Sequence, residues 1–107
     1  MKAALLDACR HALKHNLGLR QGERVVIVTD HTRPAIAAAF DQAATGQGAL
    51  LTTVSVPVAE ANGQEPGRDA AQAMREGGVV LLLTEKSLSW TRARVDATDG
   101  GARVASM

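Results

Sequence analysis

Two clusters of polar residues in this chain carry side chains that could bind a charged ligand or a metal ion. The clusters have the sequences Asp30-His31-Thr32-Arg33 and Thr84-Glu85-Lys86-Ser87. Asp30, Glu85 and His31 are residue types that serve as acids, bases or metal ligands. Lys86 and Arg33 are cations that could hold an anion or a carboxylate, with help from the amino ends of nearby helices.

The hydroxyl groups in these clusters have a structural alternative to ligand binding. Thr32, Ser87 and Ser89 each stand where a helix is expected to begin, and such hydroxyls accept the free N–H groups of a first helical turn. We expect capping to be their main role. The residues predicted to bind a ligand are Asp30, Arg33, Thr84, Lys86 and Ser87. We assign no catalytic residue and no metal ligand within the chain.

An aliphatic run precedes each polar cluster. We expect the two runs to form the strands that position the side chains of the clusters. Residues 25–29 and 79–83 are short apolar runs bounded by turn signals, which is typical of strands buried on both faces of a sheet. Residues 49–56 begin to alternate between apolar and polar side chains, which favours an edge strand that ends at Pro57. Residues 103–107 are predicted to form a fourth strand.

Four amphipathic helices are expected around these strands. They are residues 1–16, 34–46 and 68–76, and a segment whose buried stripe is predicted to be Trp90, Ala93 and Ala97. In the first helix, Cys9 belongs to the apolar stripe, so we expect a buried and unreactive thiol. His11 and His15 have the spacing of zinc ligands on a helix, but they lie opposite that stripe and should face water. Residues 58–67 are predicted to be a loop that shapes a cleft.

Strict alternation of helices and buried strands predicts an α/β fold with three α-β-α layers and a four-stranded parallel sheet. The most economical strand order is 2-1-3-4, which makes residues 25–29 and 79–83 central neighbours. The chain leaves the first of these strands toward one edge of the sheet and returns past it to the other. Because ligands of such sheets bind where the strand order reverses, we expect Asp30 and Lys86 to lie near each other there, as an ion pair or as a ligand subsite.

Composition excludes several classes of function. The chain of 107 residues is long enough for one Rossmann-like domain. With 2% aromatic residues and a formal net charge of +1, it lacks the features of a nucleic-acid-binding protein or a membrane-surface protein. It has neither a G-x-G-x-x-G nor a P-loop motif, which disfavours ordinary nucleotide binding. One cysteine and no evident targeting segment predict a cytoplasmic protein.

Two stretches resemble the aminopeptidase T family, also known as leucyl aminopeptidases. Residues 16–19, NLGL, and 22–30, GERVVIVTD, resemble the opening of that family. Residues 82–94, LLTEKSLSWTRAR, and 101–107, GARVASM, resemble its next landmark. The resemblance covers nearly the whole chain, with a weak middle.

The resemblance implies a longer parent protein of two domains, of which this chain is the amino-terminal one. It implies a metallopeptidase that uses zinc, cobalt or magnesium, with the metal ligands in the downstream catalytic domain. It also implies a homo-oligomer and a peptide substrate. The same broad family includes ring-opening dioxygenases of aromatic acids. A stand-alone module that binds a small anion, and a non-catalytic interaction domain, are the alternatives.

Overall fold

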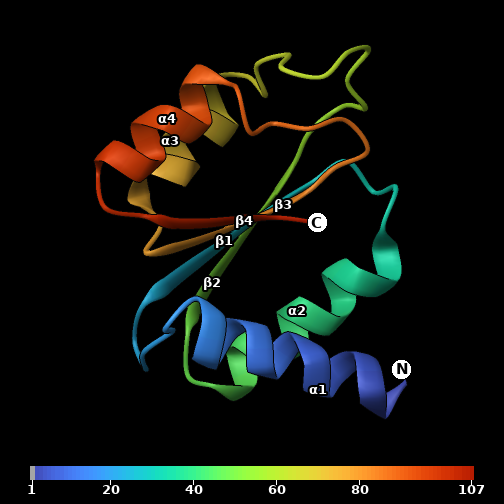
Figure 1. Ribbon diagram of the computed structural model, residues 1–107, viewed down its shortest axis with the longest axis vertical. Coiled ribbons are helices and arrows are strands. Elements are labelled where there is room, and N and C mark those ends of the chain that lie inside the picture. The colour runs from blue at the N-terminus through green and yellow to red at the C-terminus, as the bar shows by residue number, and fades with distance from the viewer. Residues whose placement is uncertain (1) are drawn as a thin grey trace.

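The computed structural model describes residues 2–107 as a parallel sheet between two pairs of helices (Figure 1). Its elements are α1 (Ala3–His11), η1 (Ala12–Asn16), β1 (Arg24–Thr29), α2 (Pro34–Gly46), β2 (Leu50–Ser55), α3 (Arg68–Glu76), β3 (Val79–Leu83), α4 (Arg92–Asp99) and β4 (Arg103–Ser106). The four strands are parallel and lie in the order β2-β1-β3-β4. The fold class and strand order predicted from the sequence are confirmed. Within residues 2–107, no helix has the length and apolar character needed to cross a membrane.

Residues 25–28 of β1 and all of β3 are apolar on both faces of the sheet, because each face supports a separate core. Alternate residues of β1 and β3 point toward α1 and α2, namely Val25, Ile27, Val79, Leu81 and Leu83. The intervening residues point toward α3 and α4, namely Val26, Val28, Val80 and Leu82. Figure 1 shows the two helix pairs on opposite sides of the sheet. The edge strand β2 has a mixed burial pattern, as its alternating sequence predicts.

The first helix differs from the predicted uninterrupted helix in its last turn. Beyond His11 the backbone widens into the π-helical segment η1, and the N–H of Leu17 donates to the carbonyl of Ala12 at 3.0 Å. Cys9 is buried as expected, and burial raises the pKa of its thiol. His11 and His15 are both exposed, which confirms the predicted solvated face.

The caps of α2 and α4 differ from the sequence-based predictions. The hydroxyl oxygen of Thr91 accepts the N–H of Arg94 at 3.1 Å, so Thr91 caps α4 in place of Ser87 or Ser89. Trp90 precedes the helix and is 84% exposed, so its predicted place in the buried stripe is wrong. At α2 the capping residue is Arg33, and no side chain caps that helix.

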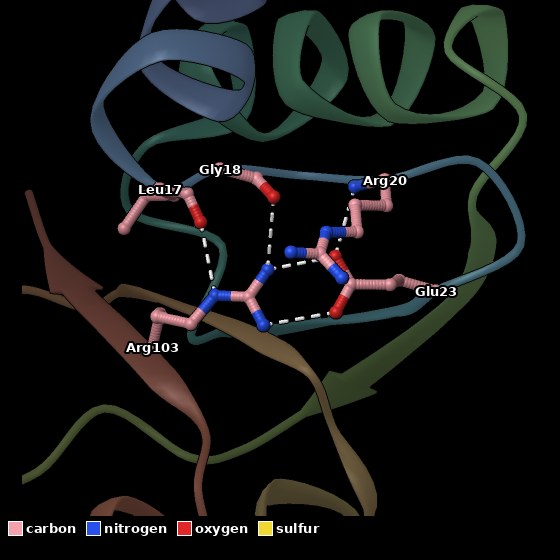
Figure 2. Close-up of polar contacts among 5 residues, drawn as sticks. All are labelled: Leu17, Gly18, Arg20, Glu23 and Arg103. Carbon is pink, nitrogen blue, oxygen red and sulfur yellow. Dashed lines mark hydrogen bonds and ion pairs between the residues drawn. The ribbon is translucent and has the colours of Figure 1, made fainter.

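A half-buried ion pair joins the amino ends of β1 and β4 (Figure 2). The guanidinium of Arg103 donates to both carboxylate oxygens of Glu23, at 2.7 and 2.9 Å. The same group donates to the carbonyls of Leu17 and Gly18, at 2.9 and 3.2 Å. Arg103 therefore anchors the turn after η1 to the sheet, at the end opposite the predicted ligand-binding residues.

A pocket at the carboxyl ends of β1 and β3

The two polar clusters meet because β1 and β3 are parallel neighbours. Thr29 pairs with Leu83 at the end of the register, so the next residues of both strands emerge side by side. Asp30 and Thr84 are buried, and Lys86 is half-buried. These three residues line one wall of a pocket of about 270 Å³, here called the strand-end pocket. Its remaining walls are Val56, Pro57, Ala59, Gln64, Glu65, Pro66, Gly67 and Leu88.

Asp30 connects the two strand ends through hydrogen bonds to neutral donors. Its Oδ1 atom accepts the N–H of Thr32 at 3.1 Å and the hydroxyl of Thr32 at 2.5 Å. Its Oδ2 atom accepts the N–H of Glu85 at 2.9 Å. Burial favours the neutral acid, but these hydrogen bonds favour the carboxylate more, and the pKa of Asp30 is lowered. Asp30 is therefore a fixed negative charge at neutral pH. The hydroxyl of Thr32 is therefore engaged with Asp30, and the cap position of α2 belongs to Arg33.

The ion pair predicted between Asp30 and Lys86 is absent. Both residues line the strand-end pocket, but within residues 2–107 no carboxylate lies at ion-pair distance from the Lys86 ammonium. The backbone of Lys86 is held instead, because the hydroxyl of Thr84 donates to its carbonyl at 2.8 Å. The pocket thus presents a positive and a negative group that do not neutralise each other by direct contact.

The loop between β2 and α3 closes the strand-end pocket and is fastened to the loop after β3. The side-chain oxygen of Asn62 accepts the N–H of Ser87 at 2.8 Å, and the N–H of Gly63 donates to the Ser87 carbonyl at 2.9 Å. The prediction that this loop shapes a cleft is confirmed. Ser87 does not line the strand-end pocket, and its hydroxyl accepts the N–H of Ser89 at 3.1 Å. A ligand-binding role for Ser87 stays a prediction.

Glu65 occupies the amino end of α4. Its carboxylate accepts the N–H groups of Arg92 and Ala93 at 2.7 and 3.1 Å. An anion at a helix amino terminus is stabilised by these unpaired N–H groups and by the helix dipole. The sequence analysis considered helix amino termini as possible binding sites for an external anion. At the amino terminus of α4, the carboxylate of Glu65 occupies that site. The sequence did not reveal this contact, because nothing local relates Glu65 to a helix 27 residues further along.

The remaining residues of the first cluster lie beside the pocket. His31 has a φ of 68°, a left-handed conformation that is uncommon for a residue other than glycine and that recurs at functional sites. Its ring Nε2 lies 2.9 Å from the hydroxyl of Ser55 at the end of β2. Arg33 is half-buried, and its Nε atom has no hydrogen-bond partner within residues 2–107. Neither residue lines the strand-end pocket, so ligand binding by Arg33 stays a prediction.

The arrangement is suited to binding a small polar molecule. Within residues 2–107, no three His, Cys, Asp or Glu side chains are placed to hold a metal ion together. Apolar walls from Val56, Pro57 and Leu88 would contact the body of a ligand, and Asp30 and Lys86 would contact its charged groups.

Comparison with known proteins identifies the fold but not the function. The sequence matches no protein-family model and no curated protein sequence. The structure is similar to that of 2,5-dihydroxypyridine dioxygenase from Pseudomonas putida KT2440, with a TM-score of 0.80 and 17% identity over 98% of this chain. It is also similar to wild-type AmpT from Thermus thermophilus, with a TM-score of 0.58 and 17% identity over 96% of this chain. The chain spans only 34% and 35% of those two proteins, respectively.

Proposed function

We propose that this chain is the amino-terminal α/β domain of a two-domain, metal-dependent aminopeptidase-like enzyme, which removes amino-terminal residues from peptides. The observation that carries the proposal is that almost the whole chain shares its fold with about a third of two longer proteins, one of them AmpT. The sequence resemblance to the aminopeptidase T family points the same way. In this proposal the domain is not catalytic alone.

The downstream domain would supply the divalent metal, whether zinc, cobalt or magnesium, and this chain would supply one wall of the cleft. The strand-end pocket has the groups for that role. The ionised carboxylate of Asp30 would attract the ammonium group of a peptide, and the ammonium of Lys86 would attract a carboxylate. Asp30 directly follows β1, and Lys86 lies in the loop that follows β3, so two packed strands would hold these groups in place for a substrate. A surface of the same domain would contribute to a homo-oligomer.

A second candidate is supported by the greater structural similarity to the dioxygenase. The TM-score of 0.80 exceeds the value of 0.58 for AmpT. In that case the domain would have the same structural role in an enzyme that opens an aromatic ring. A stand-alone anion-binding module and a non-catalytic interaction domain require no downstream domain at all.

The reading frame that encodes the chain separates these candidates first. A frame that continues past residue 107 into a region rich in His, Glu and Asp supports an enzyme, and a stop codon directly after it contradicts one. The protein encoded by the continued frame would then be assayed for release of amino acids from peptides with zinc, cobalt or magnesium. It would also be assayed for ring opening of 2,5-dihydroxypyridine with iron(II) and oxygen.

Activity of the chain by itself provides the opposite test. Purified residues 1–107 should release no amino acid from a peptide with any of these metals, because metal-dependent hydrolysis needs several fixed ligands and an open coordination position. Turnover that a chelator abolishes would overturn the proposal.

In the full enzyme, Lys86→Ala should raise KM or lower kcat, whereas Lys14→Ala, on the exposed side of η1, should change neither.

A further inference from the structure

His11 and His15 lie side by side on the exposed face of the first helical region, outside the strand-end pocket. The centroids of their imidazole rings are 4.6 Å apart, and the ring planes are tilted by 35°. Of the three histidines in the chain, only His31 has a ring nitrogen in a hydrogen bond within residues 2–107. The ring nitrogens of the His11–His15 pair are therefore available to a ligand.

The junction between α1 and η1 brings the two rings into line. Four residues of an α-helix turn about 400°, so side chains spaced by four residues are offset by about 40° around the helix axis. η1 begins at Ala12, directly after His11, and a π-helix turns less per residue than an α-helix. The π-helical segment therefore reduces the offset between His11 and His15.

The separation of the rings fits two ligands at adjacent positions of one metal ion. A metal–nitrogen bond of about 2.0–2.1 Å places a ring centroid about 3.2 Å from the ion. Two such rings at a right angle around the ion have centroids about 4.5 Å apart, and at a tetrahedral angle about 5.2 Å apart. The 4.6 Å between His11 and His15 matches the right angle, which is typical of square-planar and tetragonal Cu(II) and Ni(II).

The surroundings of the pair disfavour metal ions that need oxygen ligands. Asp7, four residues before His11, is paired with Arg10 at 3.3 Å, and the exposed Lys14 adds a positive charge. Magnesium and calcium bind through several oxygen atoms, which this face does not offer. His15 also lines an open pocket of about 500 Å³, which leaves room for water molecules at the other coordination positions of a metal ion.

We propose that His11 and His15 form a binding site for a divalent transition-metal ion that prefers right-angled coordination, in the first place Cu(II). Among the divalent ions of the first transition series, Cu(II) forms the most stable complexes with nitrogen ligands. Each imidazole supplies one nitrogen, and water fills the remaining positions. The proposal revises the sequence-based assignment, which gave the chain no metal ligand. It assigns no reaction to the site and does not depend on the proposed enzymatic function, whose metal the downstream domain would bind.

Isothermal titration calorimetry of the chain with CuCl₂, and separately with ZnCl₂, tests the site. Cu(II) should bind at one ion per chain, and Zn(II) should bind at least about tenfold more weakly. His11→Ala and His15→Ala should each weaken Cu(II) binding at least about tenfold, because a chelate loses one of its two protein ligands. The matched control is His31→Asn, which leaves the pair intact and should bind Cu(II) as the wild type does.

A rearranged pair distinguishes a chelate from loose binding to single histidines. His15→Asn combined with Asn16→His keeps the number of histidines but moves the second ring out of line with His11. This double variant should also bind Cu(II) about tenfold more weakly. Because the exchanged positions are exposed, the variant should fold normally, which circular dichroism checks.

Electron paramagnetic resonance gives the number of coordinated nitrogens directly. The Cu(II) complex of the wild type should show hyperfine coupling to two imidazole nitrogens, and that of His15→Ala to one. The proposal would be overturned by an absence of Cu(II) binding, by coupling to a single nitrogen in the wild type, or by tighter binding of Zn(II) than of Cu(II). Equal Cu(II) affinity of the wild type and the rearranged variant would overturn it as well.

Discussion

Two carboxylates flank β1, and the protein holds them in different ways. Glu23, just before the strand, bonds to the guanidinium of Arg103 from β4, which lowers the pKa of Glu23 despite its partial burial (Figure 2). Asp30, just after the strand, bonds to an N–H and a hydroxyl of Thr32 and to the N–H of Glu85. One end of the strand therefore uses a charged partner and the other end uses neutral ones.

The difference separates a structural end of the sheet from an end that is available for ligands. At the amino end, a cation that belongs to the protein compensates the charge of Glu23. At the carboxyl end, the carboxylate of Asp30 stays ionised without a cation and lines a pocket. A cationic group on a ligand would find an uncompensated charge only at the carboxyl end. This is the end at which parallel α/β sheets generally bind their ligands.

The largest expected effect comes from the strand pairing on which both ends depend. Leu82 is 1% exposed and pairs with Val28 in the centre of the sheet. Leu82→Ala should lower the free energy of unfolding by about 2–5 kcal/mol, since it removes packed methyl groups and leaves a cavity. Urea denaturation measures the change. A midpoint equal to that of the wild type would contradict the assignment of β3 as a fully packed central strand.

Asp30→Asn, at the carboxyl end of β1, should lower the free energy of unfolding more than Arg103→Ala, at the amino end. The substitution keeps the shape of the side chain but removes its charge, and it turns an amide N–H₂ toward a backbone donor of Thr32 or Glu85. A buried donor without an acceptor costs about 1–3 kcal/mol. The matched control is Asp99→Asn at the exposed end of α4, which should change stability by less than about 0.5 kcal/mol. Equal effects of the two variants would show that the Asp30 hydrogen bonds add no stability.

Arg103→Ala should have a smaller effect, although it removes four hydrogen bonds. The Arg103 side chain is 39% exposed, so water compensates part of the loss, and we expect about 1–2 kcal/mol of destabilisation. Arg92→Ala breaks an ion pair with Asp96 in which the arginine is 82% exposed, and it should cost less than about 0.5 kcal/mol. High salt should reduce the effect of Arg103→Ala and leave that of Asp30→Asn nearly unchanged, because only Glu23 relies on a cation.

The smallest expected effect is a change in the acid dependence of stability. The pKa values of Asp30 and Glu23 are lowered from ordinary values of 3.8 and 4.5, so the unfolded chain binds more protons in this range and stability rises with pH. Their contribution is complete above the ordinary values and is lost as pH falls through the lower folded values. Asp30→Asn should therefore lose less stability than the wild type between neutral pH and about pH 3. A steeper loss in the variant would contradict the direction given for Asp30.

Part of the strand-end pocket could be predicted from the sequence. Asp30, Thr84 and Lys86 each follow an aliphatic run closely, so their place at the carboxyl ends of strands could be inferred from local pattern alone. Their shared pocket followed from the strand order. Gln64 and Glu65 were missed, because a loop's position over a sheet depends on hydrogen bonds to residues far along the chain, such as those of Glu65 to α4.

The sequence by itself determined the strands, their burial and their order, because apolar runs and turn residues are local signals and few parallel topologies bury both faces of two strands. Only the tertiary structure decided which polar groups meet. Asp30 bonds to a residue 55 positions away and Glu23 to one 80 positions away, and both partners are selected by sheet register. The exposure of Trp90 also depends on where a neighbouring threonine starts its helix.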